Sequence, residues 1–303
     1  MFIVPFGLLV FTPLLVLPTA YLFVQYGKSH AVVQIMMASA LLYLAAGLSG
    51  GIFVLLVLLL MGLVLGLIIS RKWSFATSLF AISSVATITM LLWGCTAWLI
   101  DGLTWSELRT AAHDSIGNSA DTYAQMGMSQ TSIDAMVKQM HELFDYLPYL
   151  LPGLVVVGAL LLGGVVLFLA YLVFPKIQEK LELRMSLASF QVHWAFAYIS
   201  IAGLALLVIS RSLGEWQNVV LYLGIDMLLI SQTVFFYQGL AVVHWFGESR
   251  QMSKGARFSF CAVAILGQAL FQITGLFGLF DTWINCRKRF VPKTSGSGPV
   301  SKM

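Results

Sequence analysis

The amino-acid sequence predicts an all-α fold, a polytopic transmembrane bundle of about eight membrane-spanning helices with an extramembrane amphipathic helical hairpin. Hydrophobic residues make up 59% of the 303 residues and charged residues only 10%, whereas about a quarter of the residues of a soluble domain are charged. A chain this apolar cannot cover a surface that faces water, so lipid must be its main solvent. The apolar residues also gather in stretches of about 20, the length of a helix that crosses a bilayer.

Four apolar segments form a predicted N-terminal membrane portion, residues 1–100. They cover residues 2–24, 31–48, 51–70 and 75–100. The first contains Pro5, Pro13 and Pro18, so we expect it to be bent near its ends. It also lacks a basic leader, which favours a retained membrane segment over a cleaved signal peptide. The second and third segments are joined by residues 48–51 alone, which predicts a tight helical hairpin.

The long polar insertion, residues 101–146, is predicted to be the amphipathic hairpin. Its apolar residues recur at helical spacing on both sides of Gly127, which separates two amphipathic stretches. The insertion contains seven acidic residues and only two basic ones, Arg109 and Lys138. Two interpretations stay open: a simple surface hairpin, and a lid over a cavity.

A C-terminal membrane portion is predicted over residues 147–286, with apolar segments at 147–174, 190–209, 219–246 and 258–280. The first and third of these are each about 42 Å long at the helical rise, so they must tilt, extend beyond the bilayer or break. Whether 219–246 is one helix or two stays open. Residues 287–303 are predicted to be a disordered basic tail.

The distribution of basic residues indicates the orientation. Leaving out the tail, nine lysines and arginines fall in odd-numbered connections, beginning with Lys28, and three in even-numbered ones. Basic residues favour the cytoplasmic side, which puts the acidic hairpin outside. The side of the C-terminus stays open, because the basic tail conflicts with eight crossings. We expect a multi-pass protein of the bacterial inner membrane.

No motif in the sequence indicates an enzyme, a metal site or a cofactor. Cys95, Cys261 and Cys286 match no metal-binding spacing, and the five histidines are scattered. The sequence has no zinc-protease motif, P-loop or nucleophile elbow. The basic residues form short clusters between apolar segments rather than a nucleic-acid-binding patch, so we expect no nucleic-acid partner.

Polar residues inside apolar segments are the candidate binding residues, because they are costly in a bilayer. Asp226, Thr233, Tyr237 and His244 are spaced by 7, 4 and 7 residues, which places them within about 20° of one line along a helix. Gln268 and Gln272 share a face of the last segment. The two faces either line a ligand or ion site, or join helices by hydrogen bonds. Asp226 and His244 lie about 27 Å apart along the helix, so one small molecule cannot touch both.

A second candidate surface is the GxxxG pattern of Gly62 and Gly66. Two small residues one turn apart allow another helix to approach closely. The pattern indicates helix packing or, alternatively, a docking surface for a partner.

Two C-terminal motifs resemble the YybS-like family of bacterial membrane proteins. They are FYQGLAVV at residues 236–243 and GLFGLFDTW at 275–283, the second followed by RKR at 287–289. The family is distantly similar to the substrate-binding S-components of energy-coupling-factor vitamin transporters, which implies a membrane-embedded binding or transport role. The family's recurrent positions correspond to Asn218, Gln238, Gly239, Asp281, Trp283 and Arg287. The chain departs from the family at Asn285, where many members have an acid, and in lacking an extra N-terminal helix.

The leading hypothesis is a transporter-like protein that binds or translocates a small solute between its C-terminal helices. The hairpin would cover the outer mouth of the site. Because no ATP-binding motif is present, energy would come from an ion gradient or from a partner ATPase or membrane subunit. The alternative is a non-transporting scaffold or regulatory protein that docks partners through the Gly62–Gly66 face and the cytoplasmic loops.

Overall fold

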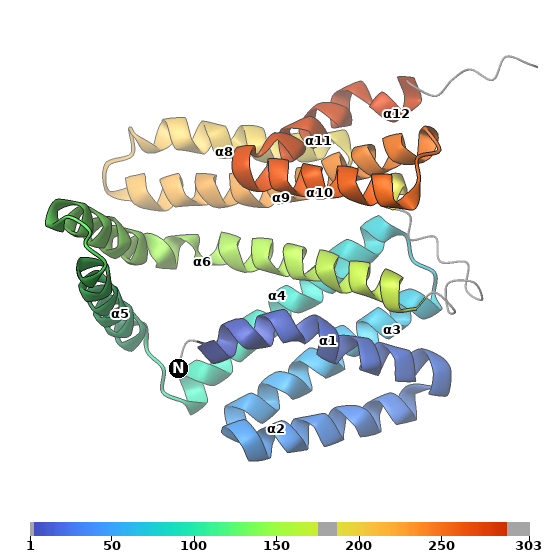
Figure 1. Cartoon of the computed structure of the whole chain (residues 1–303), viewed down its shortest axis with the longest axis horizontal. Coiled ribbons are helices and arrows are strands. Elements are labelled where there is room, and N and C mark those ends of the chain that lie inside the picture. Colours follow the sequence, from blue (N-terminus) through green and yellow to red (C-terminus); the bar gives the residue numbers. More distant parts are fainter. Residues whose placement is uncertain (1–2, 175–186, 290–303) are drawn as a thin grey trace, which may run out of the picture. The chain divides into compact units, whose positions relative to one another are not determined.

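The structure, a computed structural model, describes residues 3–174 and 187–289, which contain helices and connecting turns and no strand (Figure 1). The expected all-helical fold is confirmed for this part of the chain. The chain divides into two compact units. Unit 1 consists of Met1–Met185 and Ile199–Ile230, and unit 2 of Ser186–Tyr198 and Ser231–Met303. These units cross the boundaries at residues 100, 146 and 286 that composition suggested.

Most of the helices belong to unit 1. They are α1 (Ile3–Tyr26), α2 (Lys28–Leu56), the π-helical η1 (Val57–Gly62), α3 (Leu63–Ser70), α4 (Phe75–Ile100), α5 (Trp105–Gln125), α6 (Gln130–Val173) and nearly all of α8 (Ala197–Ser210). The short η4 (Gly214–Trp216) leads into α9 (Gln217–Ser249), which begins in unit 1 and ends in unit 2. Unit 2 adds η2 (Leu187–Ser189), η3 (Trp194–Phe196), α10 (Lys254–Phe271), α11 (Ile273–Ile284) and the short α12 (Cys286–Arg289).

The GxxxG pattern is used for packing inside unit 1. A Cβ atom added to Gly62 would lie 2.7 Å from Thr19 Cγ2, and one added to Gly66 would lie 2.6 Å from Phe23 Cδ1. Both partners belong to α1, so the two glycines let α1 lie directly on η1 and α3. The packing interpretation is therefore confirmed, and α1 already covers the face that the scaffold hypothesis assigned to a partner.

The hairpin predicted between the second and third segments turns at Gly47. This residue has φ 78° and ψ −170°, a non-helical conformation inside α2 that glycine adopts without a steric penalty. The turn therefore comes just before the predicted link at residues 48–51. Ile35, Val54 and Leu58 from the two arms form a buried apolar cluster, which holds the arms together.

The polar insertion folds as α5 and the first turns of α6. α5 begins with a capping box, in which Thr104 and Glu107 each accept a hydrogen bond from the other's backbone N–H. The chain then reverses at Gly127, which has φ 85°. Arg109 Nη2 lies 2.6 Å from Asp145 Oδ1 and ties α5 to α6. The second amphipathic stretch is not a separate helix, because α6 continues from it through Pro148 and Pro152 to Val173.

Among the described residues, five helices are long and apolar enough to cross a membrane: Lys28–Ala45, Gly47–Ser70, Phe75–Ile100, Gln130–Val173 and Gly214–Ser249. A sixth results if α10 and α11 form one broken span. The eight predicted crossings are thus not confirmed. Segment 190–209 is helical only from Trp194 onward, as η3 and the 14-residue α8. Segment 2–24 corresponds to α1, whose first side chains lie outside the described part.

Two further expectations concern the C-terminal helices. Segment 219–246 is one continuous helix, α9, and the break lies instead in segment 258–280, where α10 and α11 meet at 106°. Of the predicted tail, residues 287–289 form part of α12, and Arg287 is hydrogen-bonded to Ala188 and Phe190. Residues 290–303 lie outside the described part.

Candidate functional site

The most unusual backbone feature of unit 2 is the break between α10 and α11. Gln272 separates the two helices and has φ 55° and ψ 20°, in the left-handed region. The helix axes turn by 106° across this single residue. A change of direction in an apolar segment leaves the last carbonyls of one helix and the first N–H groups of the next without helical partners.

Side-chain hydrogen bonds surround the break, and the first of them satisfies an N–H at the start of α11. Gln268 Oε1 accepts a hydrogen bond from the N–H of Gly275 at 2.8 Å, and Gln232 Nε2 donates to the carbonyl of Gln272 at 3.1 Å. Thr274 Oγ1 donates to the carbonyl of Ala264 at 2.5 Å. The break is therefore built by specific side chains, including one from α9.

Glycines bring α11 against α9. A Cβ atom added to Gly239 would overlap the carbonyl oxygen of Thr274, and one added to Gly278 would overlap the carbonyl oxygen of Phe235. At Gly275 the added atom would overlap the side-chain amide of Gln232. Only residues without a side chain allow this approach, so the broken segment is held on α9 by backbone contact.

A buried polar network lies in the same unit. Gln238 and Asp281 are 0% and 1% exposed, and Gln238 Nε2 donates to Asp281 Oδ2 at 2.6 Å. The side-chain oxygen of Gln238 accepts from the N–H of Val192 at 3.0 Å. The other carboxylate oxygen of Asp281 accepts from the N–H of Cys286 at 2.9 Å. The network therefore joins α9, α11, α12 and the loop before η3.

Arg287 completes this network. Its two terminal nitrogens donate to the carbonyls of Ala188 and Phe190, both at 2.6 Å, and Nη2 lies 3.5 Å from Asp281 Oδ2. Burial lowers the pKa of the guanidinium, and the Asp281 carboxylate opposes that effect. Arg287 meets its partners with a planar fork of donors, and a buried network with its partners in place makes a structure rigid. The cluster of Gln238, Asp281 and Arg287 is therefore a structural anchor.

Asp226 lies apart from these groups, in unit 1. It is 6% exposed, and Oδ2 accepts a hydrogen bond from the N–H of Gly153 in α6 at 3.1 Å. Oδ1 has no hydrogen-bond partner within the part of the chain that the structure describes. Gly153 follows Pro152, and a proline disturbs the helical hydrogen bonds around it. Asp226 thus serves as a contact between α9 and α6.

The other predicted ligand residues belong to unit 2, but they do not form one cluster. Tyr237 is 6% exposed and packs its ring edge-on to Phe190, with 6.4 Å between centroids. His244 Nδ1 lies 3.6 Å from Glu248 Oε1. Thr233 is half-buried, Gln268 caps α11 and Gln272 forms the break. Helical periodicity correctly describes Asp226, Thr233, Tyr237 and His244 as aligned on one helix. It does not show which other helices and loops contact each of them.

The positions taken from the family resemblance lie in different surroundings. Gln238, Asp281 and Arg287 are joined in the anchor, and Gly239 lies against Thr274. Trp283 is 54% exposed, and Asn218 is exposed at the start of α9 in unit 1.

Sequence analysis missed Gln232 and Thr274, which support the break. Both are polar residues in apolar segments, and this was the available signal. Among residues 3–174 and 187–289, no group of three His, Cys, Asp or Glu side chains is arranged to hold a metal ion.

One of three comparisons with known proteins found a match, and it agrees with the apolar character of the chain. No curated protein and no solved structure matches the chain. A family described as "Predicted membrane protein (DUF2232)" matches residues 1–282. This match covers nearly the whole sequence, and together with the apolar helices it establishes the class of the molecule: the chain is a membrane protein and belongs to the DUF2232 family.

Proposed function

We propose that the chain is a transporter-like membrane protein that binds a small polar solute at the break between α10 and α11. The observation that carries the proposal is the 106° turn at Gln272. Non-helical backbone at membrane depth is tolerated where it is buried in protein or lines a cavity. Transporters commonly bind solutes and coupling ions at such discontinuous helices.

The local chemistry suggests the kind of solute. The positive end of the helix dipole at the start of α11 favours a negatively charged or strongly electronegative group. The side chain of Gln272 is exposed at the same place and offers both a donor and an acceptor. Thr233, which follows Gln232 in α9, is a further candidate contact, whereas Tyr237 packs on Phe190 and His244 lies beside Glu248. Energy for translocation would come from an ion gradient or a partner ATPase.

The test is to identify small molecules that copurify with the protein after gentle detergent extraction. Gln272→Ala is expected to lose a compound that the wild-type protein retains, as measured by mass spectrometry of the extracted small molecules. Gln251→Ala is the matched control, because Gln251 is also an exposed glutamine with a positive φ, 52°, at the turn between α9 and α10. Identical compounds in the wild type and both variants would contradict the proposal.

Asp226→Asn defines the extent of the site. Loss of the same compound in this variant, with folding intact, would give Asp226 a role in binding, as its alignment with Tyr237 and His244 in the sequence first suggested. Retention of the compound would confine the site to unit 2.

The alternative function is a scaffold or regulator, and one observation favours it. Asp226 is bonded to Gly153 of α6, so the acid that pointed to a solute site is used at least partly for packing. A scaffold would retain a protein partner through extraction and no solute. Crosslinking before extraction, followed by identification of the attached proteins, separates the two functions.

A further inference from the structure

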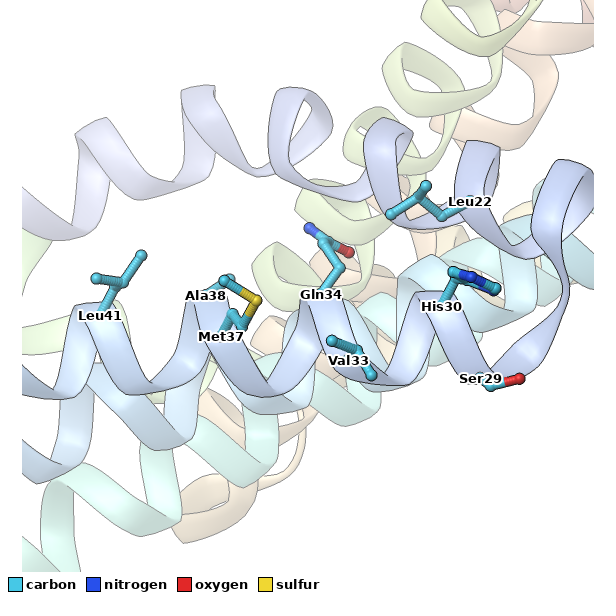
Figure 2. A pocket seen from close by; sticks show the side chains of 8 residues that line it. All are labelled: Leu22, Ser29, His30, Val33, Gln34, Met37, Ala38 and Leu41. Atoms are coloured by element: carbon cyan, nitrogen blue, oxygen red, sulfur yellow. The ribbon is translucent and has the colours of Figure 1, made fainter.

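Unit 1 contains an open groove of about 500 Å³ between α1 and α2 (Figure 2). Leu22 of α1 forms one wall, and a face of α2 forms the other. Figure 2 shows Ser29 and His30 at the end near the turn between the helices, and Leu41 at the opposite end. Val33 and Met37 lie between these ends and are 58% and 62% exposed. The groove is thus apolar along most of its length and polar at one end.

A basic residue and the start of a helix lie next to the polar end in the sequence. Lys28 is the first residue of α2, and no side chain caps that helix at Gly27. The first N–H groups of an uncapped helix have no acceptor within the helix, and the positive end of the helix dipole favours an anion there. His30 Nδ1 lies 3.0 Å from the carbonyl of Tyr26. A carbonyl only accepts, so Nδ1 carries the proton in this contact, and Nε2 is the ring nitrogen left for a ligand.

Apart from one amide side chain, the rest of the groove is lined by apolar residues. Its polar lining residue is Gln34, and Gln34 Oε1 already accepts a hydrogen bond from Thr19 at 2.6 Å. From Ser29 to Leu41 the groove follows α2 for about 18 Å at the helical rise. This is close to the depth of one leaflet, which is half of a hydrocarbon core of about 30 Å. Tyr26, 60% exposed beside the polar end, is a residue typical of the membrane interface.

We propose that this groove binds an anionic phospholipid. One acyl chain lies along Val33, Met37 and Leu41, and the phosphate lies at Lys28 and the uncapped first turn of α2. A headgroup hydroxyl, such as that of phosphatidylglycerol, donates to Nε2 of His30. The surroundings support a lipid as the occupant, since only 11% of the span Lys28–Ala45 is buried by the chain itself. The proposal is independent of the solute site in unit 2.

Native mass spectrometry of the protein from vesicles of equal parts phosphatidylglycerol and phosphatidylethanolamine tests the headgroup contact. The wild-type protein is expected to retain phosphatidylglycerol in preference. Lys28→Gln should reduce that retention about fivefold, the effect of one lysine near a membrane surface. Lys254→Gln is the matched control and should change nothing. Lys254 also begins a helix, α10, but Ser253 caps that helix.

A second pair of variants tests the acyl-chain contact. Ala38→Phe fills the groove and should abolish retention, whereas Ala40→Phe, at an exposed position of the same helix, should preserve it. Lipid retained in the vesicle ratio by all variants would overturn the proposal, because the groove would then hold only ordinary surrounding lipid. A dimer joined at this face would overturn it as well. Should Ala38→Phe fail to fold, Lys28→Gln still decides the outcome, because it alters only an exposed side chain.

Discussion

At Arg287 one guanidinium holds together three parts of unit 2. It donates to the carbonyls of Ala188 and Phe190 and lies beside the buried carboxylate of Asp281. Ala188 lies in η2, and Phe190 begins the non-helical stretch before η3, where its carbonyl accepts from this side chain. This explains why the expected crossing at 190–209 begins late as a helix.

Arg287→Ala is expected to lower the free energy of unfolding by about 3–5 kcal/mol, because it leaves a buried carboxylate without its cation. Arg287→Lys should be intermediate, since an ammonium cannot reproduce the planar fork. Denaturant titration in detergent measures the effect. The neighbouring Lys288→Ala is the control and should stay within about 0.5 kcal/mol of the wild type. Equal effects of Arg287→Ala and Lys288→Ala would show that the anchor is not structural.

Asp226 provides a second prediction for a single residue. Asp226→Ala removes the acceptor of the Gly153 N–H and should cost about 1–3 kcal/mol in the free energy of unfolding. Asp226→Asn retains an oxygen acceptor and should cost less. The same denaturant titration compares the two variants. A larger loss for Asn than for Ala would mean that the carboxylate has another role.

At the scale of elements, the packing of α1 on η1 and α3 depends on two positions without side chains. Gly66→Ala places a methyl group 2.6 Å from Phe23 Cδ1 and should lower the unfolding temperature. Gly94→Ala is the matched control in α4, where an added Cβ atom meets nothing within 4 Å. That variant should be neutral or stabilising because alanine favours helix. Equal unfolding temperatures for the two variants would contradict this account of the helix contact.

The start of α5 should depend on pH. Hydrogen bonds from the backbone and side chain of Thr104 lower the pKa of Glu107. A carboxyl group with a lowered pKa stabilises the folded state above its unfolded pKa, and that contribution is lost as the pH falls through the folded pKa. Amide hydrogen exchange in the first turn of α5, measured relative to α6 at each pH, should therefore accelerate below about pH 4. Glu107→Gln should show no such change, and a transition shared by both proteins would exclude Glu107 as its cause.

For the whole molecule, the orientation can be tested with single cysteines. Met126, beside the turn after α5, and Lys72, between α3 and α4, are both exposed. The positive-inside rule places them on opposite sides of the membrane. In a cysteine-free background, a membrane-impermeant maleimide should label Met126→Cys in intact cells and Lys72→Cys only after permeabilisation. Labelling of Lys72→Cys alone in intact cells would reverse the predicted orientation, and labelling of both would place the two turns on the same side.

Several features of the fold and the candidate site were predictable from the sequence. The helices around Gly127 follow from apolar periodicity, and the packing of Gly62 and Gly66 from their spacing. The family motifs contained Gln238, Asp281 and Arg287, which the structure joins. Periodicity failed for the line of Asp226, Thr233, Tyr237 and His244, because it describes one helix and not the neighbours of that helix. Asp226 meets α6, whereas Tyr237 meets Phe190.

The membrane setting and the helical class follow from the amino-acid sequence alone, because apolar segments of bilayer length leave the backbone no other way to satisfy its hydrogen bonds. The position of the break could be decided only by the folded chain. An apolar segment can break where side chains distant in the sequence form hydrogen bonds with its backbone. At Gln272 one of these side chains is Gln232 of α9, which donates to the backbone carbonyl. Such contacts form between helices, so the pattern within any one helix does not contain them.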